Sequence, residues 1–266
     1  MIRHENFPSR HVPARHVEVW LPPAYDQGHG RYPVLYMHDG QNCFNAADCG
    51  FGVAWDAQGA MARLAAAGQA RPAIIVGVGS SLARRTLLYR PARPFLALSA
   101  PARRAALAGR GGPPDSDAYL AFLVEEVKPF LDATYRTLPG RADTFVMGSS
   151  MGGLISLYAL CEYPDVFGGA GCLSSHWPAV EGVIAPYLRD HLPDPATHWL
   201  YFDYGTTTLD ALYAPGQAVV DGEMAAAGYS RGDNWQTLAF PGAAHNEIAW
   251  AERVRIPLRF LLRPEA

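Results

Sequence analysis

The sequence predicts an α/β fold in which a mostly parallel central sheet is covered by helices on both faces. Short apolar runs that suit β-strands alternate along the chain with longer stretches that suit helices, and this alternation is typical of parallel sheets. Most of these runs lack strict alternation of apolar and polar residues, as expected for strands buried on both faces. The chain has 266 residues, 49% of them hydrophobic, so we expect one domain spanning residues 1–266.

Seven strands and six helices are predicted from these runs. The strands are expected at 16–21, 33–38, 73–78, 144–148, 169–173, 198–204 and 235–240. The helices are expected at 55–67, 117–132, 151–163, 179–190, 212–227 and within 247–262. Asp115, Ser116 and Asp117 can accept hydrogen bonds from free amide groups at the start of the second helix. Pro257 is expected to end or kink the last helix, because proline lacks an N–H group.

The segment at about 80–114 differs in composition from the rest of the chain. It carries several prolines, no acidic residue and seven arginines: Arg84, Arg85, Arg90, Arg93, Arg103, Arg104 and Arg110. We interpret it as an insertion or a long, lid-like connection. One hypothesis is that its guanidinium groups select anionic substrates. The alternative is a surface loop that contacts only solvent or protein.

Charge and hydropathy limit the class of partner. The formal net charge is −3, whereas nucleic-acid binding relies on a basic excess. No run approaches the roughly 18 apolar residues needed to span a bilayer, and the N-terminus has no apolar signal core. We therefore expect a cytoplasmic protein that acts on a small molecule, without a nucleic-acid or membrane partner. A homo-oligomer is compatible with the sequence.

The strongest motif is Gly148-Ser149-Ser150-Met151-Gly152, which stands between a predicted strand and a predicted helix. A sharp turn between a strand and a helix exposes a serine hydroxyl at the top of a sheet, and the flanking glycines let the backbone segments pack closely. Ser150 is therefore predicted to be a nucleophile. The backbone N–H of Met151 is predicted to donate to a developing oxyanion.

A serine nucleophile needs a base, and a base needs an acid that orients it. In this type of site the partners follow in the order nucleophile, acid, histidine. His245 lies in the loop after the last predicted strand and is the predicted base. Asp210, in the loop after Gly205, is the predicted acid, and Asp203, within the preceding strand, is the alternative.

A second oxyanion donor is expected from the loop after an earlier strand. In the stretch 36–42, Gly40 lets the chain bend so that the N–H of Gln41 can face the serine. No histidine in the chain has the spacing of a metal-binding motif such as H-E-x-x-H. The Gly77-x-Gly79 pair lacks the third glycine of a dinucleotide-binding motif. Neither a metal nor a cofactor is therefore expected.

Four stretches together resemble one protein family. They are Tyr36-Met-His-Asp-Gly-Gln41, Gly148-Ser-Ser-Met-Gly-Gly153, Tyr204-Gly-Thr-Thr-Thr-Leu-Asp210 and Gly242-Ala-Ala-His245. They are similar to motifs of the "putative esterase" (esterase D-like) family of α/β-hydrolases, which includes carbohydrate, feruloyl and siderophore esterases and S-formylglutathione hydrolases. The resemblance implies the α/β-hydrolase fold and a triad of Ser150, Asp210 and His245. It also implies that Trp177 contacts the acyl or sugar part of a substrate.

These observations together predict a serine esterase that forms an acyl-enzyme. The expected substrates are short acyl or aryl esters of carbohydrates or similar small molecules, and His176 and Tyr89 are expected to contact them in addition to Trp177. A siderophore-type ester or thioester hydrolase and an acyltransferase are alternatives with the same residues. A non-catalytic binding protein on the same fold is the alternative outside enzymes.

Overall fold

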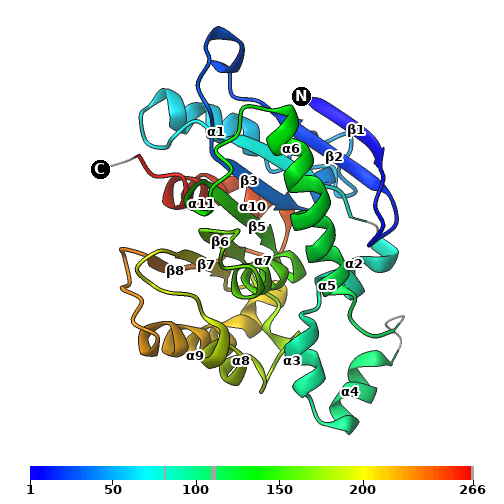
Figure 1. Ribbon diagram of the computed structural model, residues 1–266. Coiled ribbons are helices and arrows are strands. Elements are labelled where there is room, and N and C mark those ends of the chain that lie inside the picture. The colour runs from blue at the N-terminus through cyan, green and yellow to red at the C-terminus, as the bar shows by residue number, and fades with distance from the viewer. Residues whose placement is uncertain (81, 109–111, 265–266) are drawn as a thin grey trace.

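The computed structural model describes residues 1–80, 82–108 and 112–264. Within these residues, eight strands form one sheet in the order β1-β2-β4-β3-β5-β6-β7-β8 (Figure 1). Their bounds are β1 (Ile2–Phe7), β2 (Arg15–Trp20), β3 (Val34–His38), β4 (Ile74–Val78), β5 (Thr144–Ser149), β6 (Gly169–Leu173), β7 (Trp199–Gly205) and β8 (Trp235–Phe240). Strands β3 to β8 pair in parallel, whereas β1 and β2 are antiparallel. The predicted α/β class is confirmed.

Helices cover the sheet on both faces, and successive residues of a strand supply the two cores. In β3, Val34 and Tyr36 join the core under one set of helices, whereas Leu35 and Met37 join the core under the other. The first set contains α2 (Leu82–Tyr89), α5 (Ser116–Ala121), α6 (Lys128–Thr134), α7 (Met151–Glu162), α8 (Ile184–His191) and α9 (Tyr213–Ala226). The second contains α1 (Ala57–Ala66), α10 (Glu247–Arg253) and α11 (Arg255–Leu261). This two-sided burial explains the continuous apolar runs.

Two proline residues, Pro129 and Pro257, lie in helices whose regular hydrogen bonding is interrupted. The helix expected at 117–132 spans α5, a π-helical segment (Phe122–Val127) and α6. Pro129 cannot donate to the carbonyl four residues earlier, which lies in that π segment, so the wider turn precedes it. The last helix is kinked at Val254, three residues before Pro257. This kink is the one expected from the sequence.

Strand β1 was not predicted, because its sequence is mostly polar. It lies at the edge of the sheet, and its side chains are exposed or half-buried. Only Phe7 of this strand packs against the core, and an edge strand that covers so little of it needs no apolar pattern. The structure therefore adds one antiparallel strand to the seven expected.

The arginine-rich segment is helical rather than irregular. It contains α2, α3 (Ala92–Ala97) and α4 (Ala100–Leu107), and α3 and α4 extend away from the sheet in Figure 1. Arg84 pairs with Asp115 at 2.7 Å, and Arg93 pairs with Glu162 at 3.0 Å. Arg110 lies outside the described residues. Among the described helices, none is long and apolar enough to cross a membrane.

Candidate active site

Ser150 occupies the sharp turn between β5 and α7. Its backbone has φ 59° and ψ −120°, a region that non-glycine residues rarely adopt and that is often found at functional sites. A Cβ on Gly148 would lie 2.9 Å from the backbone of Gly152, so the turn closes this tightly only with glycine. The N–H of Ser150 donates to the carbonyl of Leu173 at 2.9 Å. The turn is thereby anchored to the neighbouring strand.

The structure brings Ser150, His245 and Asp210 together. His245 Nε2 lies 3.0 Å from Ser150 Oγ, and His245 Nδ1 lies 2.5 Å from Asp210 Oδ1. The three side chains come from the start of α7, the loop after β8 and the turn after β7, which all lie at the carboxyl end of the parallel strands. This geometry allows the imidazole to accept the hydroxyl proton while the carboxylate holds the ring.

Asp210 is a fully buried carboxylate that is held by several donors. Its Oδ2 accepts hydrogen bonds from Ser174 Oγ and from the N–H of Gly205, both at 2.6 Å. Burial alone would raise the pKa of Asp210, but the hydrogen bonds from His245, Ser174 and Gly205 outweigh it and lower the pKa below its usual value. Asp210 is therefore ionised at neutral pH and can stabilise an imidazolium.

Asp203, the alternative acid, has a different partner. Its Oδ1 lies 3.0 Å from Arg253 Nη2, and its Oδ2 accepts a hydrogen bond from Tyr201 at 3.0 Å. Burial raises the pKa of Asp203, although Arg253 opposes this effect. Asp210, and not Asp203, is the carboxylate within hydrogen-bond distance of His245.

Two aromatic residues that no sequence motif marks hold the His245 ring. Tyr213 and Trp250 both meet the imidazole edge to face, with ring centroids 5.5 Å and 4.9 Å away. The indole Nε1 of Trp250 also donates to Ser174 Oγ at 3.0 Å. The imidazole is thus packed between two rings, which restricts its rotation.

The two predicted oxyanion donors lie at helix starts. Gln41 belongs to a short 3₁₀ helix (Gly40–Asn42) after β3, and Met151 is the first residue of α7. The first N–H groups of a helix have no acceptor within the helix, so neither amide is used in the backbone hydrogen bonds of its own helix. A Cβ on Gly40 would lie 2.4 Å from the backbone of Gly77. Glycine is therefore required for this loop to pack against β4.

A pocket of about 600 Å³ opens beside Ser150 and His245. Its lining includes Gln41 and the aromatic residues Phe51 and Trp250. The other lining side chains are mostly polar: Asp39, Asn42, Asp48, Ser80, Arg85, Asn246 and Glu247. The pocket therefore combines flat apolar surfaces with hydrogen-bonding groups next to the serine hydroxyl.

The three expected substrate contacts are not part of the lining described for this pocket. Tyr89 is fully buried, and its hydroxyl accepts the N–H of Asp39 at 3.2 Å. We therefore assign Tyr89 to the support of Asp39 rather than to substrate. Trp177 is 3% exposed and lines a separate hollow of about 240 Å³. His176 lies close to Ser150, since its N–H donates to the Ser150 carbonyl at 3.2 Å.

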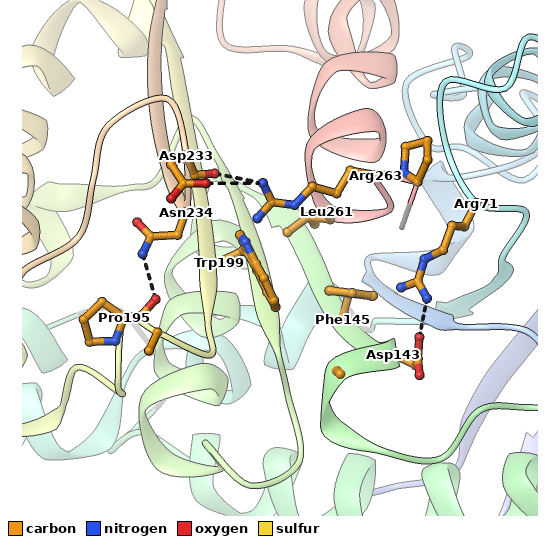
Figure 2. Close-up of a pocket in the computed structure, with 12 residues that line it drawn as sticks. Arg71, Asp143, Phe145, Pro195, Trp199, Asp233, Asn234, Leu261 and Arg263 are labelled. Carbon is orange, nitrogen blue, oxygen red and sulfur yellow. Dashed lines mark hydrogen bonds and ion pairs between the residues drawn. The ribbon is translucent and has the colours of Figure 1, made fainter. Parts of the chain in front are cut away.

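A second pocket of about 530 Å³ lies at the opposite end of the sheet (Figure 2). Figure 2 shows Arg263 paired with Asp233 beside Trp199, and Arg71 paired with Asp143 beside Phe145. The two ion pairs are 3.7 Å and 2.6 Å long. Its charged groups have partners within the protein, and it lies near the first residues of β5 and β7, far from Ser150. Across the described part of the chain, no group of three or more His, Cys, Asp or Glu side chains could hold a metal ion.

Comparison with known sequences identifies the family. Residues 13–252 match the family described as "Putative esterase". The curated "Uncharacterized protein YbbA" of Bacillus subtilis (strain 168) is 26% identical over 164 residues, which is 61% of this chain. That match spans 58% of the relative's own length.

Solved structures show the same fold. A ferulic acid esterase has a TM-score of 0.71 at 19% identity, covering 98% of this chain and 97% of that one. An IroE-like serine hydrolase from Shewanella oneidensis has a TM-score of 0.71 at 17% identity, covering 96% and 78%. The enterobactin esterase FES from Shigella flexneri has a TM-score of 0.70 at 15% identity, covering 98% and 58%. Because the family match covers most of the sequence, the chain belongs to the "Putative esterase" family of α/β-hydrolases.

Proposed function

We propose that this protein is a serine carboxylic ester hydrolase that works through an acyl-enzyme. One observation carries the proposal: an unbroken series of hydrogen bonds joins Asp210, His245 and Ser150 at the edge of a pocket. A serine hydroxyl is a poor nucleophile unless an adjacent base removes its proton. The membership of an esterase family supports the same reaction class.

In the first half of the reaction, Ser150 Oγ attacks the ester carbonyl carbon while His245 Nε2 takes the hydroxyl proton. The carbonyl π electrons move to the oxygen, which becomes an oxyanion that accepts hydrogen bonds from the Gln41 and Met151 amides. When the intermediate collapses, the bond to the alcohol oxygen breaks. That oxygen takes the proton from His245, and the acyl group remains bound to Ser150 as an ester.

In the second half, water replaces the alcohol. His245 Nε2 takes a proton from water, and the water oxygen bonds to the acyl carbon. Collapse of this second intermediate breaks the bond to Ser150 Oγ, which regains its proton from His245. The net reaction converts an ester and water into an acid and an alcohol, and Asp210 stays ionised throughout.

The pocket favours short acyl or aryl esters of carbohydrates and similar small molecules. Phe51 offers an exposed flat surface, and Asn42, Gln41 and Glu247 offer hydrogen-bonding groups near it. Flat rings that carry hydroxyl groups match such a lining. Siderophore-type esters, thioesters and acyl transfer to an alcohol use the same residues and are the alternatives. A substrate panel with product analysis in the presence of an alcohol acceptor separates them.

Labelling with a fluorophosphonate tests the proposed mechanism. We expect stoichiometric modification of Ser150, and we expect Ser150→Ala to abolish both labelling and hydrolysis of p-nitrophenyl acetate. Ser99→Ala, a serine at the start of α4, is the matched control and should behave as the wild type. Absence of labelling in the folded wild type would instead support a non-catalytic binding protein.

A further inference from the structure

Arg85, on helix α2 of the arginine-rich segment, contacts both halves of the candidate oxyanion site. Its Nε donates to Asp39 Oδ1 and Oδ2 at 2.9 and 3.0 Å, and its Nη2 donates to Asp39 Oδ2 at 2.8 Å. The same Nη2 lies 3.3 Å from the carbonyl oxygen of Ser149. Asp39 stands two residues before Gln41, and Ser149 stands two residues before Met151. One guanidinium group therefore bridges the two segments that carry the amides.

Asp39 is itself held in an unusual conformation. Its backbone is left-handed, with φ 56° and ψ 49°, and the residue is 6% exposed. Burial would raise the pKa of Asp39, but the charge and the hydrogen bonds of Arg85 outweigh it and lower the pKa. Asp39 is therefore a carboxylate at neutral pH. Because its partner is a buried ion, losing Arg85 would leave an unpaired charge at the start of the loop.

Ser80 extends this contact to Gln41. Its hydroxyl donates to Asp39 Oδ1 at 2.5 Å. Its backbone N–H donates to Gln41 Oε1, and Gln41 Nε2 donates to its hydroxyl, both at 3.1 Å. The Gln41 side chain is thus fixed to the same carboxylate that Arg85 holds. The backbone of Gln41, which carries the amide N–H, is therefore restrained through its own side chain and through Asp39.

We propose that Arg85 is a positioning residue that sets the separation of the Gln41 and Met151 amides. This inference rests on the proposed esterase function. Oxyanion stabilisation requires donors at about 2.7–3.1 Å from the developing charge, with a tolerance of about 0.5 Å. A planar guanidinium bound through two nitrogens fixes distance and direction, whereas a lysine ammonium fixes neither. The arginine-rich segment thereby supports the reaction without touching the reacting atoms.

The test compares Arg85→Ala and Arg85→Lys with Arg84→Ala. Arg84 lies on the same helix, is paired with Asp115 and is half exposed, so its loss should leave activity unchanged. For Arg85→Ala we expect kcat for p-nitrophenyl acetate to fall roughly 10²-fold, as for a small misplacement of catalytic groups, with KM nearly unchanged. Binding of a phenyl trifluoromethyl ketone, which forms a tetrahedral adduct with serine, should weaken by the same factor as kcat/KM. Free guanidinium ion should restore part of the activity of Arg85→Ala.

The outcomes separate this inference from the proposed function. If fluorophosphonate fails to label Ser150 in the wild type, the esterase proposal itself fails. If labelled Arg85→Ala keeps kcat within two-fold, or loses kcat without losing ketone affinity, the positioning role is refuted. A loss confined to KM for anionic esters would show that Arg85 binds substrate instead. If Arg85→Ala does not fold, Arg85→Lys decides, because wild-type kcat and ketone affinity in that variant would also refute the role.

Discussion

Replacement of Asp210 by asparagine should change the tautomer of His245, because of the hydrogen bonds that Asp210 accepts. Oδ2 of Asp210 accepts two donors, Ser174 Oγ and the N–H of Gly205. An asparagine must place its carbonyl oxygen there, because its NH₂ group cannot accept a hydrogen bond. The NH₂ group then faces His245 Nδ1 and forces that nitrogen to be the acceptor. The proton of the neutral ring moves to Nε2, where it blocks transfer from Ser150.

The expected loss is large and specific to catalysis. Imposing the wrong histidine tautomer costs about 10⁴-fold in kcat, which corresponds to roughly 5 kcal/mol of transition-state stabilisation. Asp203→Asn is the matched comparison, since both acids are fully buried and contact Arg253. That variant weakens an ion pair that does not include His245, so we expect a loss of up to about 3 kcal/mol in stability. Its activity per folded molecule should remain within about ten-fold of wild type.

Steady-state hydrolysis of p-nitrophenyl acetate, normalised to folded protein by circular dichroism, measures the effect on activity. Urea unfolding measures the effect on stability. The reasoning is refuted if Asp210→Asn keeps kcat within ten-fold of wild type, or if Asp203→Asn loses as much activity as Asp210→Asn while folded.

Three further predictions concern residues around the triad. Gly148→Ala should destabilise the fold by about 1–3 kcal/mol, because its Cβ would meet Gly152 at 2.9 Å. Gly140→Ala, where nothing lies within 4 Å, is the control, and equal urea midpoints for the two variants would contradict this. Ser174→Ala should cost about 1–3 kcal/mol in urea unfolding, because it leaves the buried indole N–H of Trp250 without its acceptor and removes one of the donors to Asp210; an unchanged midpoint argues against it. Burial raises the pKa of Glu247 above its usual value, so the folded state holds this proton more tightly than the unfolded state. The wild type therefore loses stability as pH rises through the pKa of the unfolded state and then that of the folded state. Glu247→Gln should therefore gain in melting temperature over wild type from pH 4 to pH 7, and a constant difference would disprove the assignment.

The sequence predicts the central sheet and the candidate triad because both depend on local patterns. Strands β3 and β5 are short apolar runs, and the predicted bounds differ from the observed ones by one residue at one end of each. Ser150 is marked by glycines within two residues. His245 and Asp210 follow from chain order along a parallel sheet, because the carboxyl ends of its strands meet at one edge.

The supporting contacts could not be predicted in the same way, because they join residues that are distant in sequence. Arg85 and Asp39 are 46 positions apart, and nothing in the local sequence distinguishes Arg85 from the other arginines of its segment. Trp250 was expected only as part of a helix, and its contact with His245 depends on the angle at which α10 packs. Trp177 shows the reverse case. Its resemblance to a family motif after β6 implies a contact with substrate. Its ring is instead buried against α9, where Gly216 leaves room for it.

The two buried acids near His245 divide their roles through Arg253. Its Nη2 lies 3.0 Å from Asp203 and 3.9 Å from Asp210, so one positive charge serves two carboxylates. The shorter contact neutralises the charge of Asp203. The negative charge that remains lies on Asp210, which faces the imidazole. When His245 takes the Ser150 proton in the proposed mechanism, its positive charge brings this cluster to neutrality. The buried cluster thus favours the imidazolium form that the transition state requires, and it does so without rearrangement.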